Sequence, residues 1–504
     1  MLILPGLIFT SGCATNPVTG KSELALVGKT QEVAMGQKAY AQSQQAQGGD
    51  LVTFPSVTSY VQRVANSIIK VSDRPGLPYE IVVLNNSVPN AWALPGGKMA
   101  INRGLLVEME NEAELAAVLA HEIVHAAARH GAKNMERGIL LQSALIGAGV
   151  ALSDNDYRDI ALGGLNAAAV FGTMKYSRNA EYEADKYGVK YMVAAGYDPQ
   201  GAVTLQQKFM AMKNEQNPSW LQGMLSSHPP SANRVSRNKE LARRYPSGKI
   251  GYEEYQRAMA PLFRSEDAYK KHGEGVKALS KGNHALALEL AQQAIQMEPR
   301  EAHFYNLSSK AYAKQNKLNK ALQEIDKALA RNDNYFEFHL QKGQIEAARG
   351  NRNAARTSYL ASNRLLPTAT AHHGLGLMAQ QNGNTRNAIA HFRVAAASET
   401  PAGRASSAML SGMGQNSPQR VVRSQLILNQ QGYLNVSVQN MSNTPINNLV
   451  VRVQVGHQSR NIRIPGTLPA GRSRTVPAGF GPYKNATQLN GQVTSQVISV
   501  STVR

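Results

Sequence analysis

The segment from His121 to His125 reads His-Glu-Ile-Val-His, which has the residue types and spacing of a hydrolytic metal site. It follows residues 112–120, whose alanine, leucine and glutamate content predicts a helix. Because residues four apart share one face of a helix, the two imidazoles can bind the same zinc ion. Glu122 can then act as general base toward a water on that ion. The pattern predicts a zinc-dependent hydrolase, and a chance match on a solvent-exposed helix is the alternative.

A catalytic zinc ion usually has three protein ligands, so one more is required. Glu181 and Asp185 lie four residues apart in a second predicted helix, which ends near Gly196. One of these carboxylates can bind the metal while the other orients a ligand from behind. Without the motif at residues 121–125, the same stretch would be interpreted as a charged helix face.

Together, the two motifs resemble those of the zinc metallopeptidases that include HtpX, the CAAX prenyl proteases and BepA-like periplasmic lipoproteins. The resemblance covers roughly residues 13–245, and the segments 15–20, 90–101 and 227–234 are also similar to the family. Activity, metal and site residues of that family therefore become expectations for this chain.

The resemblance implies one zinc ion per chain, bound by His121, His125 and Glu181. Glu122 is then the general base, and Asp185 orients one of the ligands.

His228 and Arg234 belong to the loop at 227–234, and the resemblance leaves two roles open for them. In one, His228 occupies the fourth zinc position, excludes water and keeps the enzyme latent. In the other, His228 and Arg234 stabilise the developing oxyanion, a task suited to preorganised donors. A buried loop histidine without a catalytic role is the remaining interpretation.

Residues 82–84 and 99–101 predict two short strands separated by a turn rich in proline and glycine. A free sheet edge binds an extended peptide by backbone pairing, which is largely independent of side chains. We therefore expect an endopeptidase that acts on unfolded or misassembled polypeptides. In the family, the segment matching 90–101 is an edge strand that receives substrate. The residues implied in substrate binding are Asn90, Gly96, Gly97 and Met99.

The single cysteine, Cys13, follows an apolar segment that ends in small residues and resembles a bacterial lipobox. The resemblance implies cleavage before Cys13 and acylation of its thiol, which anchors the protein to a membrane. Thr10 stands where leucine is usual, and residues 1–9 lack basic side chains. A buried free cysteine in a cytosolic protein is the alternative. Ala14 stands where lipoproteins that stay in the inner membrane typically have aspartate. We therefore expect the lipid anchor to lie in the inner leaflet of the outer membrane of a Gram-negative bacterium, with the protein in the periplasm.

Two further apolar stretches, 139–152 and 160–171, are shorter than the ~20 residues that a membrane-spanning helix requires. They predict buried helices, with a membrane-dipping hairpin as the alternative. The net charge of +20 raises the question of nucleic-acid binding. Lysine and arginine are scattered, however, and no nucleic-acid-binding motif accompanies them. We therefore expect no nucleic-acid partner.

After residue 245 the chain becomes periodic. Short turns recur with spacings of 34, 34 and 33 residues, and an alanine follows five residues after the start of each turn. This period is typical of tetratricopeptide repeats, whose stacked helix pairs bury a continuous core. Their concave face would bind a peptide or protein partner, and a structural spacer is the alternative. The turns begin at Gly282, Asn316, Gly350 and Gly383.

Residues 398–419 are rich in serine, glycine, alanine and proline, which predicts a flexible linker. Beyond them, segments that alternate with period two predict a small β-sandwich.

The sequence therefore predicts a multidomain protein. Its fold class is a mainly α, zincin-like metallopeptidase domain with a small β-sheet, an α-solenoid of tetratricopeptide repeats and a small C-terminal β-sandwich. The predicted boundaries are 1–13 for a lipoprotein signal segment, 14–262 for the metallopeptidase domain, 266–399 for about four repeats, 400–420 for the linker and 421–504 for the β-sandwich.

Two functions from different classes follow. The first is a zinc endopeptidase of envelope quality control, in which the repeats recruit clients or assembly partners. The second is a periplasmic chaperone or scaffold that acts through the repeats, while His228 keeps the peptidase domain inactive for most of the time.

Overall fold

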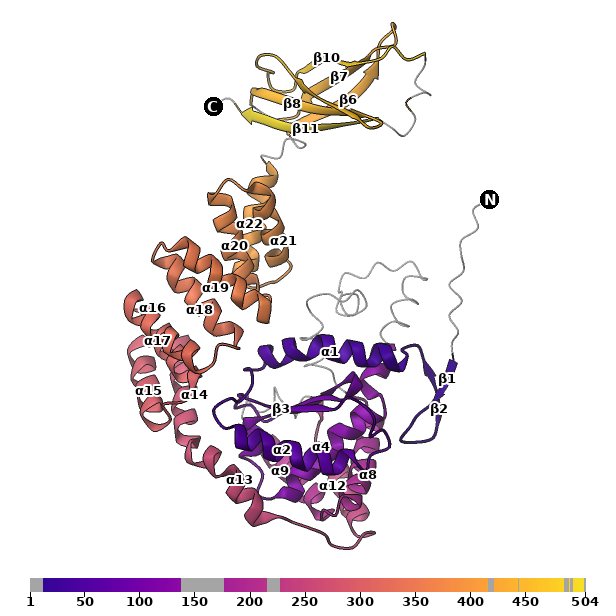
Figure 1. The fold of residues 1–504 in the computed structure, drawn as a ribbon, viewed down its shortest axis with the longest axis vertical. Helices are drawn as coiled ribbons and strands as arrows, with labels where there is room; N and C mark the ends of the chain where they lie inside the picture. Colours follow the sequence, from indigo (N-terminus) through magenta and orange to yellow (C-terminus); the bar gives the residue numbers. More distant parts are fainter. Residues whose placement is uncertain are drawn as a thin grey trace. The chain divides into compact units, whose positions relative to one another are not determined.

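The structure is a computed structural model, and it describes residues 12–136, 176–214, 227–415, 421–442, 444–484, 489 and 493–502. Residues 1–371 form one compact unit and residues 372–504 a second, and each is described by itself (Figure 1). The apolar stretches 139–152 and 160–171 lie outside the described residues. Within the described part of the chain, no helix combines the length and apolarity that crossing a bilayer requires.

A three-stranded sheet lies in the first unit. Strand β5 (Lys98–Asn102) is central, with β3 (Glu80–Leu84) parallel on one side and β4 (Ala91–Leu94) antiparallel on the other. The two strands predicted at 82–84 and 99–101 are confirmed. The residue pattern alone placed the sequence of β4 in the turn between them, whereas the family resemblance implied an edge strand within residues 90–101, where β4 lies.

The helix that carries the His-Glu motif, α4 (Glu112–Ala127), lies in the middle of the same unit. Asn111 caps it by accepting from the amide of Glu114 at 3.0 Å, and all 16 residues are buried. Such a helix reads as apolar or small on every side, which explains its many alanines. The other helices of this part of the unit are α1 (Lys29–Ala46), α2 (Pro55–Ile69), α3 (Arg103–Leu106), α8 (Arg178–Ala194), α9 (Gln200–Asn214), α12 (Ala232–Ala242) and α13 (Tyr252–Arg264).

Near the start of the described chain, β1 (Gly12–Thr15) pairs with β2 (Ser22–Ala25). Cys13 lies in β1, where it is the backbone partner of Leu24. The side chain of Cys13 and residues 1–11 lie outside the described part. Acylation of Cys13 therefore stays a prediction.

The predicted repeats form pairs of antiparallel helices. The residues that begin the turns, two of which are Gly282 and Asn316, have positive φ angles of 80° and 59°. Glycine adopts this conformation without cost and asparagine at a small cost, which explains the recurrent residue types. The alanines five residues later are all 0% exposed, since they lie where paired helices approach: Ala287, Ala321, Ala355 and Ala388. The helices of the first three pairs are α14 (Glu266–Ser280) and α15 (His284–Met297), α16 (Ala302–Lys314) and α17 (Leu318–Arg331), and α18 (Phe336–Ala348) and α19 (Arg352–Leu365).

The fourth pair consists of α20 (Ala369–Gln381) and α21 (Thr385–Ala396), and it is followed by a further helix, α22 (Pro401–Gln415). The prediction of a flexible linker is therefore wrong for residues 401–415. Pro401 suits the first position of a helix, and small side chains allow α22 to pack closely on α21. Ser406, for example, is 0% exposed and lies 2.8 Å from Nδ1 of His373. Composition alone did not distinguish close packing from flexibility.

The C-terminal residues form a β-sandwich, as predicted. Its sheets have the orders β10-β7-β6 and β11-β8-β9, and valines from both sheets share one core. In β7 buried residues alternate with partly exposed ones, the period that the sequence indicated. The strands are β6 (Val422–Leu428), β7 (Leu434–Asn440), β8 (Ile446–Val455), β9 (Gln458–Arg463), β10 (Ser473–Phe480) and β11 (Val493–Thr502).

Candidate metal centre

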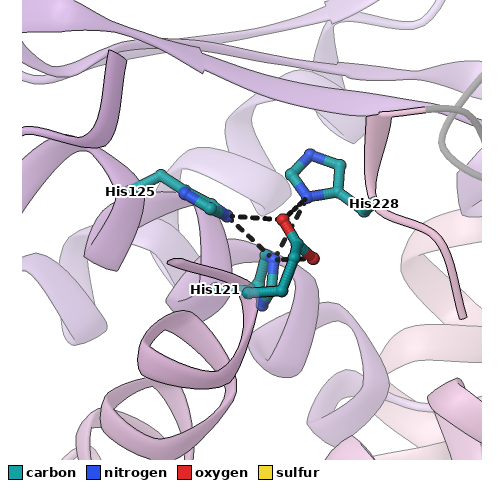
Figure 2. Close-up of side chains that lie close together, drawn as sticks. His121, His125 and His228 are labelled. Carbon is teal, nitrogen blue, oxygen red and sulfur yellow. Dashed lines mark hydrogen bonds and ion pairs between the residues drawn. The ribbon is translucent and has the colours of Figure 1, made fainter. Parts of the chain in front are cut away.

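His121 and His125 project from successive turns of α4 with their Nε2 atoms 3.0 Å apart (Figure 2). Their side chains are buried, and both Nε2 atoms point to the same place. The helix therefore positions the two imidazoles as the four-residue spacing predicts.

Glu181 reaches the same place from α8. Its Oε2 lies 3.5 Å from Nε2 of His121, and its Oε1 lies 3.5 Å from Nε2 of His125. Helix α8 approaches the backbone of α4 closely at Gly188, where a Cβ would lie 3.4 Å from the amide nitrogen of His121, an ordinary van der Waals contact.

The fourth member of the cluster is His228, which precedes α12. Its Nδ1 lies 2.9 Å from Oε1 of Glu181 and 3.3 Å from Nε2 of His121 (Figure 2). One ligand atom from each of His121, His125, Glu181 and His228 lies within 4.8 Å of the others, and all four residues are buried. His228 therefore lies among the residues that could hold a metal ion, and the choice between its two predicted roles stays open.

Arg234 binds the acidic residues of the site. Its Nη2 and Nε donate to the two carboxylate oxygens of Asp185 at 2.6 and 2.7 Å, and its Nη1 lies 2.8 Å from Oε2 of Glu181. The guanidinium is thus bound by two carboxylates in this structure, and its role toward an oxyanion stays a prediction. Asp185 in turn lies 3.1 Å from Nδ1 of His121, so the expected support of a ligand by Asp185 is present in the geometry.

The electrostatics of the cluster fit a bound cation. Burial lowers the pKa of His125 well below its ordinary value, so this imidazole is neutral. Burial raises the pKa of Glu181, but neighbouring imidazoles, His228 foremost, lower it by more, and the carboxylate is ionised. Burial lowers the pKa of His121, but Asp185 and Glu181 together raise it to about 9. A cation therefore competes with a proton at His121, whereas His125 and Glu181 already have the form that binds metal.

Glu122 provides a second test of whether the residues of this site suit a zinc ion. Both its carboxylate oxygens are buried and accept no hydrogen bond from any residue that the structure describes. Its Oε1 lies 3.4 Å from Nε2 of His228, and burial raises its pKa above the ordinary value. A buried carboxylate without donors is costly, so it indicates a site that binds something further. Zinc with a water fits this donor set of two imidazoles and a carboxylate.

Two residues of the site were missed by sequence reasoning. Tyr176 stacks on the ring of His125 with a centroid distance of 3.9 Å and an interplanar angle of 19°. His130 lies with its Nδ1 2.8 Å from Nδ1 of His125. Their positions give only a weak signal: Tyr176 directly precedes the helix of Glu181, and His130 follows the motif by five residues.

The edge of the sheet lies beside the cluster. The amide of Asn102 donates to the carbonyl of Asn90 at 2.8 Å, so the backbone groups that point from β4 to β5 belong to alternate residues, starting at Asn90. The backbone groups of Ala91 and Ala93 then face the other side of β4, where no described strand pairs with it. The hydroxyl of Tyr176 donates to the carbonyl of Ala93 at 3.3 Å.

Three of the four residues predicted to bind substrate do not belong to this edge. Met99 is in the central strand β5 and is 0% exposed. Gly96 and Gly97 form a turn with φ of 79° and 89°, in which a Cβ would meet Val33 and Tyr79 respectively. The need for these glycines is conformational and steric, and the substrate contacts expected for all three stay predictions. Asn90, at the start of β4, remains a candidate.

Comparison with known proteins identifies the domain. Residues 55–242 match peptidase family M48. The chain is 32% identical over 227 residues to the mitochondrial metalloendopeptidase OMA1 of Schizosaccharomyces pombe, covering 44% of this chain and 65% of that relative. It is 25% identical over 385 residues to the beta-barrel assembly-enhancing protease of Escherichia coli (strain K12), covering 68% of this chain and 76% of that relative.

Solved structures match the repeats. The Arabidopsis OM64 TPR domain is 17% identical, with coverage of 23% of this chain and 98% of that chain and a TM-score of 0.23. The repeat assignment itself rests on the helix pairs and their period.

The match to the family spans the motif of α4, the acidic residues of α8 and the loop of His228. Residues 55–242 of this chain are therefore similar to peptidase family M48, and this match together with the named relatives supports a metalloprotease.

Proposed function

We propose that this chain is a zinc-dependent endopeptidase that hydrolyses unfolded or misassembled polypeptides. In this proposal His121, His125 and Glu181 hold one zinc ion, and Glu122 is the general base. The observation that carries it is the convergence of buried ligand atoms beside a carboxylate whose oxygens accept no hydrogen bond from the described residues.

The chemistry follows from these positions. Zinc, when bound, polarises the scissile carbonyl and acidifies a water. Glu122 accepts the proton of that water and passes it to the leaving amine. Asp185 holds Nδ1 of His121 and is itself held by Arg234, so the imidazole keeps its orientation while Glu122 exchanges protons.

His228 is the latency device in this proposal. Its Nδ1 lies among the ligand atoms, at the place that a water or a substrate carbonyl has to enter. Removal of this imidazole opens a coordination position, which a catalytic zinc site requires. Substrate hydrolysis then depends on withdrawal of the loop that carries His228.

The substrate class follows from β4. An extended polypeptide pairs with the outward amide and carbonyl groups of Ala91 and Ala93 as an added strand. Backbone pairing selects for extended conformation rather than for side chains, so unfolded and misassembled proteins are the substrates. Entry of a substrate displaces the hydroxyl of Tyr176 from the carbonyl of Ala93.

The repeats deliver clients or assembly partners to the peptidase domain through a peptide or protein bound in their groove. This part is supported by contacts between the two: Gln45 of α1 accepts from the amide of Phe336 at 2.8 Å and donates to the carbonyl of Asn334 at 2.7 Å. By analogy with the beta-barrel assembly-enhancing proteases, the clients are proteins of β-barrel assembly. The lipobox-like segment before Cys13 supports a lipid anchor on the periplasmic side of a membrane.

A cleavage assay tests the proposal. The zinc-loaded wild type, Glu122→Gln and His228→Ala are each incubated with casein, a protein without stable structure. We expect slow cleavage by the wild type, faster cleavage by His228→Ala and none by Glu122→Gln. His457→Ala, which removes an exposed imidazole, is the control and matches the wild type. If His228→Ala binds zinc and leaves casein intact, the proposal is wrong.

A complementation experiment in cells distinguishes the scaffold function from proteolysis. A Glu122→Gln variant that binds zinc and restores the phenotype of a deletion strain would assign the cellular role to the repeats. Loss of complementation, with normal protein levels, would assign it to proteolysis.

A further inference from the structure

A row of three side chains lies behind one of the histidines of the metal centre. Nε2 of His125 points to the cluster, whereas its Nδ1 lies 2.8 Å from Nδ1 of His130. Nε2 of His130 lies 3.3 Å from Oε2 of Glu183 in α8. His130 is 4% exposed, so water does not provide an alternative partner on most of its surface.

The protons of this row are fixed by the need for one donor in each contact. An imidazole that binds metal through Nε2 carries its proton on Nδ1, so His125 donates from Nδ1. Nδ1 of His130 must then be the acceptor and hold no proton. A neutral His130 consequently carries its proton on Nε2 and donates it to Glu183. With neutral imidazoles, this is the only arrangement that satisfies both contacts.

The backbone explains how His130 reaches this position. Helix α4 ends at Ala127, and Arg129 has a φ of 61°, which is uncommon for a residue other than glycine. This left-handed residue interrupts the helical path between His125 and His130, whose Nδ1 atoms lie 2.8 Å apart. Arg129 is held there by Glu32, at 3.2 Å from Nε, and by the carbonyl of Val27. A strained residue kept in place by buried partners often belongs to a functional site.

We propose that His130 is a positioning residue that fixes the tautomer and ring orientation of His125 for metal binding, and that Glu183 anchors it. The inference deepens the proposed function, on which it rests. The two histidines of α4 are then supported differently: His121 by the carboxylate of Asp185, and His125 by a second imidazole backed by a carboxylate. Partners of this kind raise the basicity of a ligand and limit its rotation.

The test is zinc affinity, measured on the full chain by competition with a chelator of known affinity. His130→Leu removes the acceptor, and we expect its zinc affinity to fall by about 10- to 100-fold. His130→Asn can place its Oδ1 near the former Nδ1, so affinity is expected to stay close to that of the wild type. The rise in melting temperature on zinc addition should shrink in His130→Leu and persist in His130→Asn.

A second pair of variants covers the case in which His130→Leu does not fold. Glu183 is partly exposed, at 27% for its side chain, so changes there are tolerated by the fold. Glu183→Gln keeps an acceptor and should bind zinc like the wild type, whereas Glu183→Leu should bind it more weakly. His457→Ala again serves as the control.

The outcomes distinguish this inference from the proposed function. If the wild type binds no zinc, the proposed function fails and this inference fails with it. If the wild type binds one zinc and both leucine variants bind it equally well, only the role of His130 is overturned. Weaker binding by the leucine variants, with rescue by His130→Asn and Glu183→Gln, supports the positioning role.

Discussion

Two buried clusters in the first unit contain histidine and carboxylate side chains, and only one of them has the form of a metal centre. In the cluster around Glu181, ligand atoms converge and the carboxylate of Glu122 lacks hydrogen-bond donors among the described residues. In the other, Glu301 is 1% exposed and accepts from Tyr269 at 2.6 Å, Thr53 at 2.8 Å and Asn85 at 2.9 Å. Because these donors occupy the lone pairs of the Glu301 carboxylate, none remains available to bind a cation.

The difference teaches that residue type does not define a metal site, whereas the balance of donors and acceptors does. Thr53 and Asn85 belong to the peptidase domain, and Tyr269 and His303 belong to the repeats. Glu301 therefore joins two parts of the first unit. In the proposed function Glu122 serves chemistry instead, and its lack of donors among the described residues costs stability.

The largest effect is expected at Glu122. Because this residue carries the proton transfers, Glu122→Gln should lower the cleavage rate of an unfolded substrate by about 10²- to 10⁴-fold. Bound zinc, measured by mass spectrometry under native conditions, should stay at one per chain. A variant that retains more than a tenth of the wild-type rate would show that another group is the base.

The next effect tests the stability side of the comparison. Glu301→Ala removes the acceptor of Tyr269, Thr53, Asn85 and the amide of His303, which should lower the free energy of unfolding of the first unit by about 3 kcal/mol. Glu122→Ala removes a carboxylate that accepts no hydrogen bond from the described residues, so it should lower stability much less. Urea denaturation of both variants checks this. Equal losses of stability in the two variants would show that the two carboxylates do not differ in what they contribute to the fold.

The third largest effect is expected from removing His228, the residue proposed to keep the enzyme latent. His228→Ala should raise the rate of casein cleavage by about tenfold, equivalent to 1.36 kcal/mol of barrier, because it removes an imidazole from the position that substrate must enter. Initial rates at saturating zinc provide the measurement. Should the rate fall instead, His228 stabilises the reacting atoms rather than blocking them.

The pH dependence of stability sharpens the comparison further. Burial raises the pKa of Glu301, but His303 and Tyr269 lower it by more, and the net pKa lies below its ordinary value of 4.5. The stabilisation is therefore complete above pH 4.5 and is lost as the pH falls below that value toward the lowered pKa. Thermal unfolding between pH 6 and roughly pH 3 should show a steeper acid loss in the wild type than in Glu301→Gln. Identical slopes would mean that Glu301 is not the group responsible.

The smallest effect is expected at the edge of β4. Tyr176→Phe removes one hydrogen bond, worth about 1 kcal/mol, from the carbonyl that substrate has to pair with. The KM for an extended peptide should fall by roughly fivefold. A fall in kcat with constant KM would instead place the hydroxyl beside the reacting atoms.

Features set by local spacing could be predicted from the sequence. The pair His121 and His125 needed only a helix, and the repeat turns needed only a recurrent positive φ. Features that depend on packing could not. His130 reaches His125 through an unusual backbone angle at Arg129, which carries no local signal because arginine rarely adopts it. Likewise, the donors to Glu301 come from residues far apart in the chain.

Strand β4 and helix α22 show two further reasons for failure. Strand β4 has only four residues next to proline and glycine, so its sequence resembles a turn. Helix α22 consists largely of small residues, which favour close packing and flexible segments alike. The sequence identified the loop that carries His228. That its imidazole lies among the candidate ligand atoms could be learned only from the distances in the structure.

The way in which Arg234 is bound has a consequence for activation. Its Nη1 donates to the carbonyl oxygens of His228 and Pro229 at 3.5 and 3.3 Å, whereas its contacts to Asp185 are 2.6 and 2.7 Å. Withdrawal of the loop breaks the two long contacts and leaves the short ones intact. In the proposed latency mechanism, withdrawal of the loop and loss of the metal are thus separate events, and we expect the enzyme to open and close without releasing its ion.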